Sequence, residues 1–116
     1  MTNEATYQAR KDQILSGGKE KYHESNAKIG KLFARERINQ LVDKDSFVED
    51  GFFANCMNDE FPADGIVTGI GKINGRTVCV MANDSTVKAG SWGEKTVEKI
   101  IRFQETCLKM LCPLIY

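Results

Sequence analysis

The stretch IVTGIGKINGRTVCVMA, residues 66–82, decides the fold of this 116-residue chain. Its two halves, residues 66–73 and 76–82, are both rich in the β-branched and apolar side chains of strands. Asn74-Gly75 joins them, and this pair tolerates the two positive φ angles of a type I′ turn. The segment from Val78 to Ala82 is apolar on both faces. The stretch therefore predicts a β-hairpin whose second strand is central in a sheet covered on both sides.

The clearest helix follows the hairpin, at residues 94–111. Its expected buried stripe consists of apolar residues at helical spacing, with i,i+4 ion pairs on the exposed side: Val97, Ile100, Ile101, Leu108 and Leu111, with Glu98/Arg102 and Glu105/Lys109 as the pairs. Ser91 and Glu94 are spaced as a capping box at its start. Pro113 cannot continue a helix. Residues 114–116 are then expected to begin a buried strand, and a domain that stops there is expected to be truncated.

Upstream of the hairpin, the sequence predicts mostly helix. Residues 2–16 are expected to form an exposed helix that stops at Gly17-Gly18. Residues 19–31 are polar and are expected to form a loosely helical, solvated arm. A further helix is predicted at residues 34–42, then a turn at residues 43–46, a short strand near Val48, and a surface loop at residues 55–64. We expect two parts: a helical arm, residues 1–30, and the beginning of an α/β domain, residues 31–116.

Composition excludes several functional classes. Sixteen Lys and Arg balance sixteen Asp and Glu, so the net charge is zero and gives no general attraction to nucleic acid. No apolar run approaches the length of a membrane span, and the polar start argues against a secretory signal. The four cysteines lack zinc-site spacing, so no metal site is expected and the thiols are expected to be reduced, as in the cytoplasm.

Four segments in order resemble the carboxyltransferase subunits of biotin-dependent acyl-CoA carboxylases and decarboxylases: GKLFARERINQLVD (30–43), DGIVTGIGKINGRTVCVMAND (64–84), STVKAGSWGEKTVEKI (85–100) and PLIY (113–116). The resemblance implies a partial crotonase-like fold of repeated ββα units. It implies transfer of a carboxyl group between carboxybiotin and the α-carbon of an acyl-CoA. It also implies biotin carried by a partner, a biotin carboxyl carrier or biotin carboxylase component, and a homo-oligomer of the full-length protein.

The same resemblance implies that the chain lacks a catalytic centre. In this family the oxyanion-stabilising glycine turns follow the strand that begins at residue 113, so no catalytic residue is assigned and no cofactor is expected to bind the chain itself. Two alternatives stay open. The parent protein could be the carboxyltransferase subunit of a biotin-dependent decarboxylase, or the chain could act alone as a non-catalytic CoA-binding or subunit-interaction module.

The candidate substrate-binding residues belong to two places in the sequence. Lys31 and Arg35, within a basic cluster that also contains Lys28 and Arg37, suit the phosphates of CoA, although such a cluster also suits a solvated helix face. The loop with Gly90, Ser91 and Gly93 precedes a helix, whose free N–H groups can hold an anion or a carbonyl oxygen.

Neighbouring residues are given structural roles. Phe33 replaces the Thr or Ser usual in the family before the ARER segment, so that helix is expected to start with a packed rather than a capped residue. Trp92 is expected to be a packing anchor rather than a cofactor stacker. Residues 83–86 are expected to make turn or cap contacts, and His23 to be solvated or locally bonded.

Overall fold

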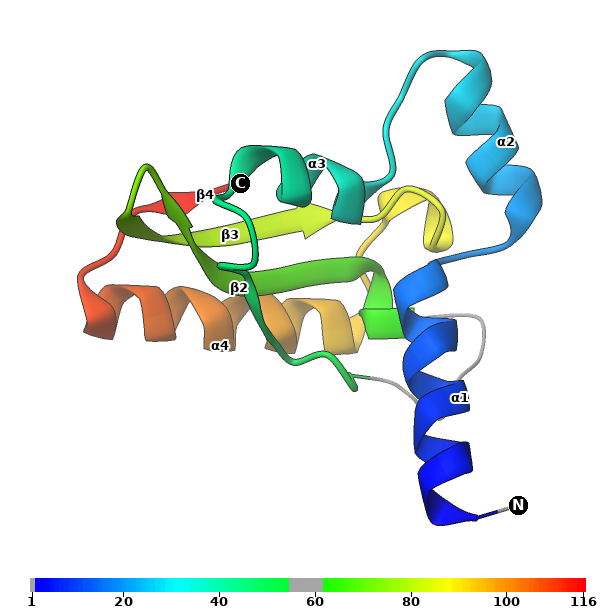
Figure 1. Ribbon diagram of the computed structural model, residues 1–116, viewed down its shortest axis with the longest axis horizontal. Coiled ribbons are helices and arrows are strands. Elements are labelled where there is room, and N and C mark those ends of the chain that lie inside the picture. Colours follow the sequence, from blue (N-terminus) through cyan, green and yellow to red (C-terminus); the bar gives the residue numbers. More distant parts are fainter. Residues whose placement is uncertain (1, 55–61) are drawn as a thin grey trace.

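A computed structural model describes residues 2–54 and 62–116, which form an α/β structure built on one four-stranded sheet (Figure 1). The strands are β1 (Val48–Asp50), β2 (Ile66–Ile73), β3 (Arg76–Asn83) and β4 (Leu114–Ile115), in the spatial order β1-β2-β3-β4. β1, β2 and β3 pair antiparallel, and β4 pairs parallel with β3. Helix α4 (Glu94–Met110) covers one face of the sheet and α3 (Ala34–Leu41) the other (Figure 1).

The predicted hairpin is confirmed. β2 and β3 pair from Ile66↔Asn83 to Ile73↔Arg76, and both turn residues have positive φ, 51° at Asn74 and 79° at Gly75. The Asp43 carboxylate accepts the N–H groups of these two residues at 2.9 and 2.8 Å. The turn after α3 therefore holds the hairpin turn in place, in addition to the expected local bond from Ser46 N–H to the Asp43 carbonyl.

The sheet has an apolar core on each face, as the two-sided pattern of residues 78–82 predicts. The core under α4 contains the buried residues Ile66, Cys79, Met81, Ile100, Phe103 and Cys107. The core under α3 contains Ile38, Val42, Val67, Val78 and Val80. Successive residues of β3 alternate between the two cores because side chains along a strand point to opposite faces. β3 is thus central, with β2 on one side and β4 on the other.

The predicted buried stripe of α4 is wrong except at Ile100. The residues that α4 buries are Thr96, Lys99, Ile100, Phe103 and Cys107. Val97, Ile101 and Leu108 lie on the surface with 41%, 50% and 74% of their area exposed. α4 carries two apolar stripes, and the sheet covers the one that includes Phe103, the largest fully buried side chain of the described residues.

The expected i,i+4 pairs of α4 also differ in the structure. Glu98 pairs with Lys95 at 3.3 Å, and Arg102 pairs with Asp50 of β1 at 3.3 Å. Leu111 ends the helix in a left-handed conformation, with φ 54°, two residues before Pro113.

The arm consists of α1 (Asn3–Ser16) and α2 (Glu20–Lys28), joined at Gly17, which has φ 72° and ends α1 as expected. α2 has no buried residue, but the arm is not simply solvated. Gly18 N–H donates to the Thr86 hydroxyl at 2.8 Å, and the Asn26 amide donates to the Ser85 hydroxyl at 2.9 Å. The arm is therefore attached to the segment that follows β3.

The start of α3 is packed rather than capped, as predicted. No side-chain hydrogen bond caps the helix at Phe33. The Phe33 ring instead lies against His23, with the ring centroids 4.8 Å apart.

Two 3₁₀ segments complete the fold, η1 (Pro62–Gly65) before β2 and η2 (Lys88–Gly90) before α4. The expected surface loop lies mostly, and Cys56 entirely, outside the described residues. Among the helices that are described, none is long and apolar enough to cross a membrane. Within residues 2–54 and 62–116, no group of three or more His, Cys, Asp or Glu side chains is arranged to hold a metal ion.

Candidate binding site

A pocket of about 440 Å³ lies where α3, the end of β3, the η2 loop and the end of β4 meet. Its size falls in the usual range for small-molecule sites. Ten residues line it: Lys31, Arg37, Met81, Ala82, Asn83, Ser85, Ala89, Gly90, Trp92 and Tyr116. We call this the Lys31 pocket. It brings together two of the predicted site residues, Lys31 and Gly90, from segments far apart in the sequence.

Two cations stand at the rim of the Lys31 pocket. Lys31 and Arg37 are both exposed, on either side of the start of α3. Within the part of the chain that the structure describes, neither forms an ion pair. Their charges are therefore available to an anionic group in the pocket, for which guanidinium and ammonium groups are the usual protein partners.

An unsatisfied hydrogen-bond donor lies in the same pocket. The Tyr116 hydroxyl donates to the side-chain carbonyl oxygen of Asn83. The Nδ2 atom of Asn83 is buried and has no partner among the described residues. A buried amide N–H without a partner is costly, by about 1–3 kcal/mol. A ligand atom that accepts a hydrogen bond from Asn83 would remove that cost.

The segment between β3 and the pocket wall is held by local side-chain bonds. Asp84 is buried, and its carboxylate accepts the N–H and the hydroxyl of Thr86 at 2.9 and 2.5 Å. This confirms the turn chemistry expected for residues 83–86. With the contacts from Gly18 and Asn26, these bonds fix the backbone that leads from Asn83 to the η2 loop.

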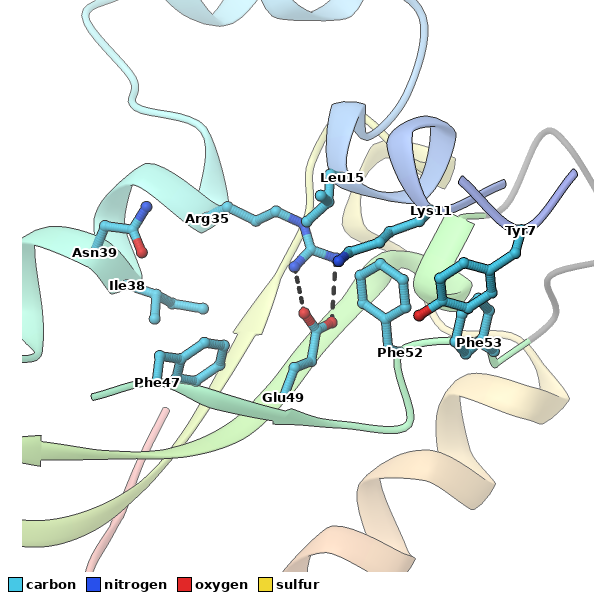
Figure 2. Close-up of a pocket in the computed structure, with 10 residues that line it drawn as sticks. All are labelled: Tyr7, Lys11, Leu15, Arg35, Ile38, Asn39, Phe47, Glu49, Phe52 and Phe53. Carbon is cyan, nitrogen blue, oxygen red and sulfur yellow. Dashed lines mark hydrogen bonds and ion pairs between the residues drawn. The ribbon is translucent and has the colours of Figure 1, made fainter. Parts of the chain in front are cut away.

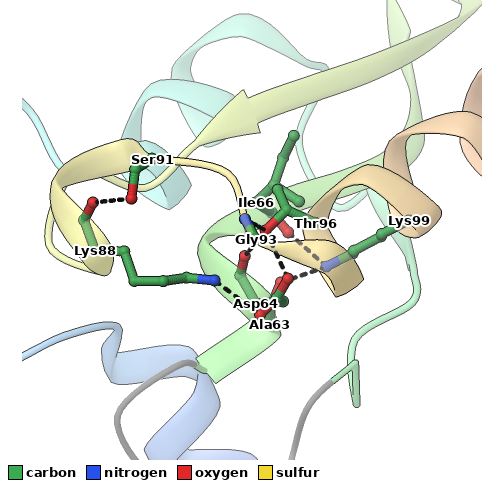
Figure 3. A network of polar contacts seen from close by, with 8 residues as sticks. All are labelled: Ala63, Asp64, Ile66, Lys88, Ser91, Gly93, Thr96 and Lys99. Carbon is green, nitrogen blue, oxygen red and sulfur yellow. Dashed lines mark hydrogen bonds and ion pairs between the residues drawn. The ribbon is translucent and has the colours of Figure 1, made fainter.

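Ser91 and Gly93, the other two predicted loop residues, lie beside the pocket but not in its lining. The predicted Ser91–Glu94 capping box is wrong, because the N-cap of α4 lies two residues after Ser91. Gly93 is the N-cap, and its N–H donates to the Thr96 hydroxyl at 3.0 Å. The Ser91 hydroxyl instead donates to the Lys88 carbonyl at 2.6 Å, within the η2 loop (Figure 3).

Arg35 lies in a different pocket, of about 510 Å³, between α1, α3 and β1 (Figure 2). Its guanidinium makes a two-pronged ion pair with Glu49, at 2.5 and 3.1 Å, and lies 5.5 Å from the centre of the Phe52 ring. Both side chains of the pair are largely buried. The structure thus separates Arg35 from Lys31 and uses it to join α3 to β1.

Buried charge lies on the far side of the η2 loop. Lys99 of α4 is 6% exposed, and its ammonium donates to the carbonyls of Ala63 and Ile66 (Figure 3). Burial lowers the pKa of Lys99 from 10.5 to about 8, against the opposing effect of Glu49 and other nearby carboxylates. The Asp64 carboxylate, 1% exposed, is 3.1 Å from the Lys88 ammonium and accepts the Thr96 hydroxyl at 2.6 Å.

The chemistry of the Lys31 pocket is that of binding. It offers two cations, a buried amide donor and the exposed ring of Trp92, which suits an anion joined to a planar group. The ten residues that line it include no histidine and no carboxylate.

Sequence reasoning missed several members of this pocket. Trp92 is 54% exposed, so its expected role as a packing anchor is wrong. Asn83 and Tyr116 carried no local signal, because they meet only through the parallel pairing of β3 and β4. Arg37 belongs to the basic cluster that the sequence predicts, but it is not among the residues predicted to contact CoA.

Comparison with known proteins gives a consistent set of similarities. Residues 25–116 match the family model described as carboxyl transferase domain. The uncharacterized carboxylase YngE of Bacillus subtilis is 67% identical over 107 residues, covering 92% of this chain and 21% of that protein. The biotin-dependent 3-methylcrotonyl-coenzyme A carboxylase beta1 subunit of Mycobacterium tuberculosis is 42% identical over 103 residues, 86% of this chain and 20% of that protein.

Two further similarities bear on the reaction and the fold. The methylmalonyl-CoA decarboxylase subunit alpha of Veillonella parvula is 42% identical over 110 residues, 89% of this chain and 22% of that protein. The structure of transcarboxylase 12S, solved as a hexamer with methylmalonyl-coenzyme A and methylmalonic acid, superposes with a TM-score of 0.88 at 35% identity. The superposition covers 98% of this chain and 24% of the transcarboxylase chain. The chain spans about a fifth of the length of the curated relatives it matches.

Proposed function

Because this chain belongs to the carboxyl transferase domain family, we propose that its Lys31 pocket binds the phosphate-bearing end of an acyl-CoA. The observation that carries the proposal is one pocket with two cations that form no ion pair, and a buried amide N–H that has no acceptor, among the described residues. Lys31 and Arg37 contact the phosphates, Asn83 donates to a carbonyl or ring nitrogen, and Gly90 allows close approach of the ligand. Arg35, Ser91 and Gly93 remain predicted contacts.

The proposed reaction of the whole protein is carboxyl transfer between carboxybiotin and the α-carbon of an acyl-CoA. In this transfer the α-carbon would lose a proton and form a bond to the carboxyl carbon, the bond from that carbon to the biotin nitrogen would break, and the proton would pass to the released biotin. Biotin is carried by a partner, a biotin carboxyl carrier or biotin carboxylase component, and the protein is a homo-oligomer that acts in the cytoplasm. The 116 residues supply part of the acyl-CoA site and no catalytic group.

A second candidate is the same transfer run in reverse, in a biotin-dependent decarboxylase. The similarity to the methylmalonyl-CoA decarboxylase subunit supports it as well as the similarity to the carboxylase subunits supports the first. The fate of radiolabelled carboxyl groups distinguishes the two. A carboxylase moves label from bicarbonate to the acyl-CoA, and a decarboxylase releases label from the acyl-CoA.

The third candidate, a non-catalytic CoA-binding or subunit-interaction module, shares the pocket but needs no transfer. It predicts that the 116-residue chain binds CoA and folds cooperatively by itself. A purified chain with no sharp thermal transition would exclude this candidate while leaving the first two intact.

Titration calorimetry with CoA tests the proposed site. Lys31→Ala and Arg37→Ala should each weaken binding, and added salt should weaken it further, because both side chains contact phosphates. Lys109→Ala is the matched control, since Lys109 is exposed at the far end of the 17-residue α4, about 22 Å from its start. Equal loss in all three variants, or no binding at millimolar CoA, would overturn the proposal.

A further inference from the structure

We infer that Asp64 is a positioning residue for the Lys31 pocket, because its carboxylate holds both ends of the loop that forms one wall. The wall residues are Ala89, Gly90 and Trp92. The inference rests on the proposed function for the identity of the ligand, and it concerns a residue that does not itself line the pocket.

The two oxygens of Asp64 reach to the two ends of this loop (Figure 3). Oδ1 lies 3.1 Å from the ammonium of Lys88, the first residue of η2. Oδ2 accepts the hydroxyl of Thr96, in the first turn of α4, at 2.6 Å. The wall residues lie between these two anchor points in the chain, so the contacts of this carboxylate help to set their position relative to the sheet.

Thr96 and Lys88 also form hydrogen bonds with the loop backbone. The Thr96 hydroxyl accepts the N–H of Gly93 at 3.0 Å, which orients the peptide just after Trp92. The Lys88 carbonyl accepts the N–H and the hydroxyl of Ser91, at 2.9 and 2.6 Å, which closes the loop from the other side. The N–H groups of Ser91 and Gly93 are thus already bonded inside the loop.

The loop backbone needs such anchors because its conformation is unfavourable by itself. Lys88 and Ala89 both have left-handed φ angles, 48° and 52°. Non-glycine residues hold this conformation only where surrounding contacts compensate a cost of about 1 kcal/mol or more for each residue. Trp92 is more than half exposed and adds little packing. The contacts to Asp64 add to the packing of buried Val87, which directly precedes Lys88.

Asp64 itself is firmly placed. It follows Ala63, and both have left-handed φ angles, 50° and 53°. Lys99 donates to the carbonyls of Ala63 and Ile66, on either side of Asp64, and so fixes the turn that presents the carboxylate. A buried carboxylate is tolerated only when charged and hydrogen-bonding partners surround it, as Lys88 and Thr96 do here.

A double-mutant cycle on the 116-residue chain tests the inference, with CoA as the probe. Lys88→Met and Thr96→Val each release one anchor, and Asp64→Asn weakens both. We expect each to weaken CoA binding by about fivefold or more, because small displacements of a binding wall are costly. Lys88→Met should have a clearly smaller effect in the Asp64→Asn background than in the parent chain, since its contact with the aspartate is then already weakened. Lys95→Met, in the same turn of α4 but paired with Glu98, is the matched control and should bind normally.

Trp92 fluorescence is a second readout, which reports on the loop without CoA. Trp92 is the only tryptophan of the chain, so its fluorescence reports on the loop alone. Quenching of Trp92 by acrylamide should rise in Lys88→Met. In Thr96→Ser, which keeps the hydroxyl, it should equal that of the parent chain. The inference would be overturned if Lys88→Met left both the quenching of Trp92 and the CoA affinity unchanged. The proposed function would still stand in that case, provided that the parent chain binds CoA through Lys31. If the parent chain binds no CoA, both fail.

Discussion

Gly18 lies directly against Thr86: its N–H donates to the threonine hydroxyl at 2.8 Å, and a Cβ on Gly18 would lie 1.8 Å from the threonine carbonyl oxygen. This contact is where the arm meets the segment that leads to the Lys31 pocket. No side chain fits there, because the atom it would meet belongs to the backbone. The arm and the pocket wall are thus parts of one structure.

Gly18→Ala should therefore release the arm. We expect a loss of about 1–3 kcal/mol, the usual cost of inserting a methyl group into a filled space. Hydrogen exchange should show faster exchange in α1 and α2. Gly30→Ala is the control for a Cβ in open space, and its positive φ of 73° gives it a strain of about 1 kcal/mol of its own. The comparison is therefore made on hydrogen exchange in α1, and equal acceleration there in the two variants would mean that the contact with Thr86 does not hold the arm.

The ion pair between Arg35 and Glu49 predicts a difference between two substitutions. Arg35→Lys keeps the charge but loses the two-pronged geometry, so it should destabilise the fold by about 1–2 kcal/mol. Arg35→Ala should cost more, because it leaves the largely buried Glu49 without its partner. Urea unfolding measures both. CoA titration of Arg35→Ala also tests the predicted contact with substrate, since normal affinity in a folded variant would remove Arg35 from the site.

How far the sequence predicts this structure depends on whether the determining contacts are local. The hairpin was predictable because Asn74-Gly75 and the pattern of residues 78–82 lie within one stretch. The buried face of α4 was not. Thr96 and Lys99 are buried because Asp64, Ala63 and Ile66 receive their hydrogen bonds, and that turn has no periodic pattern.

The same distinction applies to the Lys31 pocket. Lys31 and Gly90 were predicted from residue type and family resemblance. Asn83 and Tyr116 were not, because only the pairing of β3 with β4 brings them together. The division into residues 1–30 and 31–116 stays a prediction, and the bonds from Gly18 and Asn26 place the two parts in contact.

The exposed stripe of α4 predicts self-association of the isolated chain. Val97, Ile101 and Leu108 lie along one side of the helix away from the sheet. Exposed apolar stripes of this kind promote association. Ile101→Gln with Leu108→Gln should reduce the oligomer fraction in sedimentation velocity. Glu105→Gln is the control, since it changes an exposed polar residue on the same helix. A parent chain that is monomeric and cooperatively stable would contradict this prediction.

Thiol reactivity should differ between Cys79 and Cys112. Burial, together with the smaller effects of the neighbouring Cys107 and Cys112 thiols, raises the pKa of Cys79 from 9.0 to about 12. At pH 8 only roughly one Cys79 in 10⁴ is then a thiolate, the form that reacts. Iodoacetamide should modify the half-buried Cys112 long before Cys79, as followed by peptide mass spectrometry. Early labelling of Cys79 in the folded chain would refute the prediction, and unfolding in urea should abolish the difference.

The buried ammonium of Lys99 predicts how stability depends on pH. Burial lowers its pKa from 10.5 to about 8 in the folded chain, whereas the unfolded chain keeps the ordinary value. Between these two values the unfolded chain binds a proton that the folded chain does not. The free energy of unfolding should therefore rise with pH across this window, by about 3 kcal/mol from Lys99 alone. Below pH 8 Lys99 is protonated in both states, so it adds no pH dependence there.

Two measurements test this dependence directly. In ¹³C NMR of the lysine side chains, one Cε signal should titrate near pH 8, well before the signals of exposed lysines, and it should be missing in Lys99→Met. Urea unfolding between pH 8 and 10.5 should show a rise in stability for the parent chain relative to Lys99→Met, because other titrating groups are common to both. A Lys99 signal that titrates with the exposed lysines would mean that water reaches the ammonium. The turn around Asp64 would then be held by hydrogen bonds to a solvated lysine rather than by a buried charge.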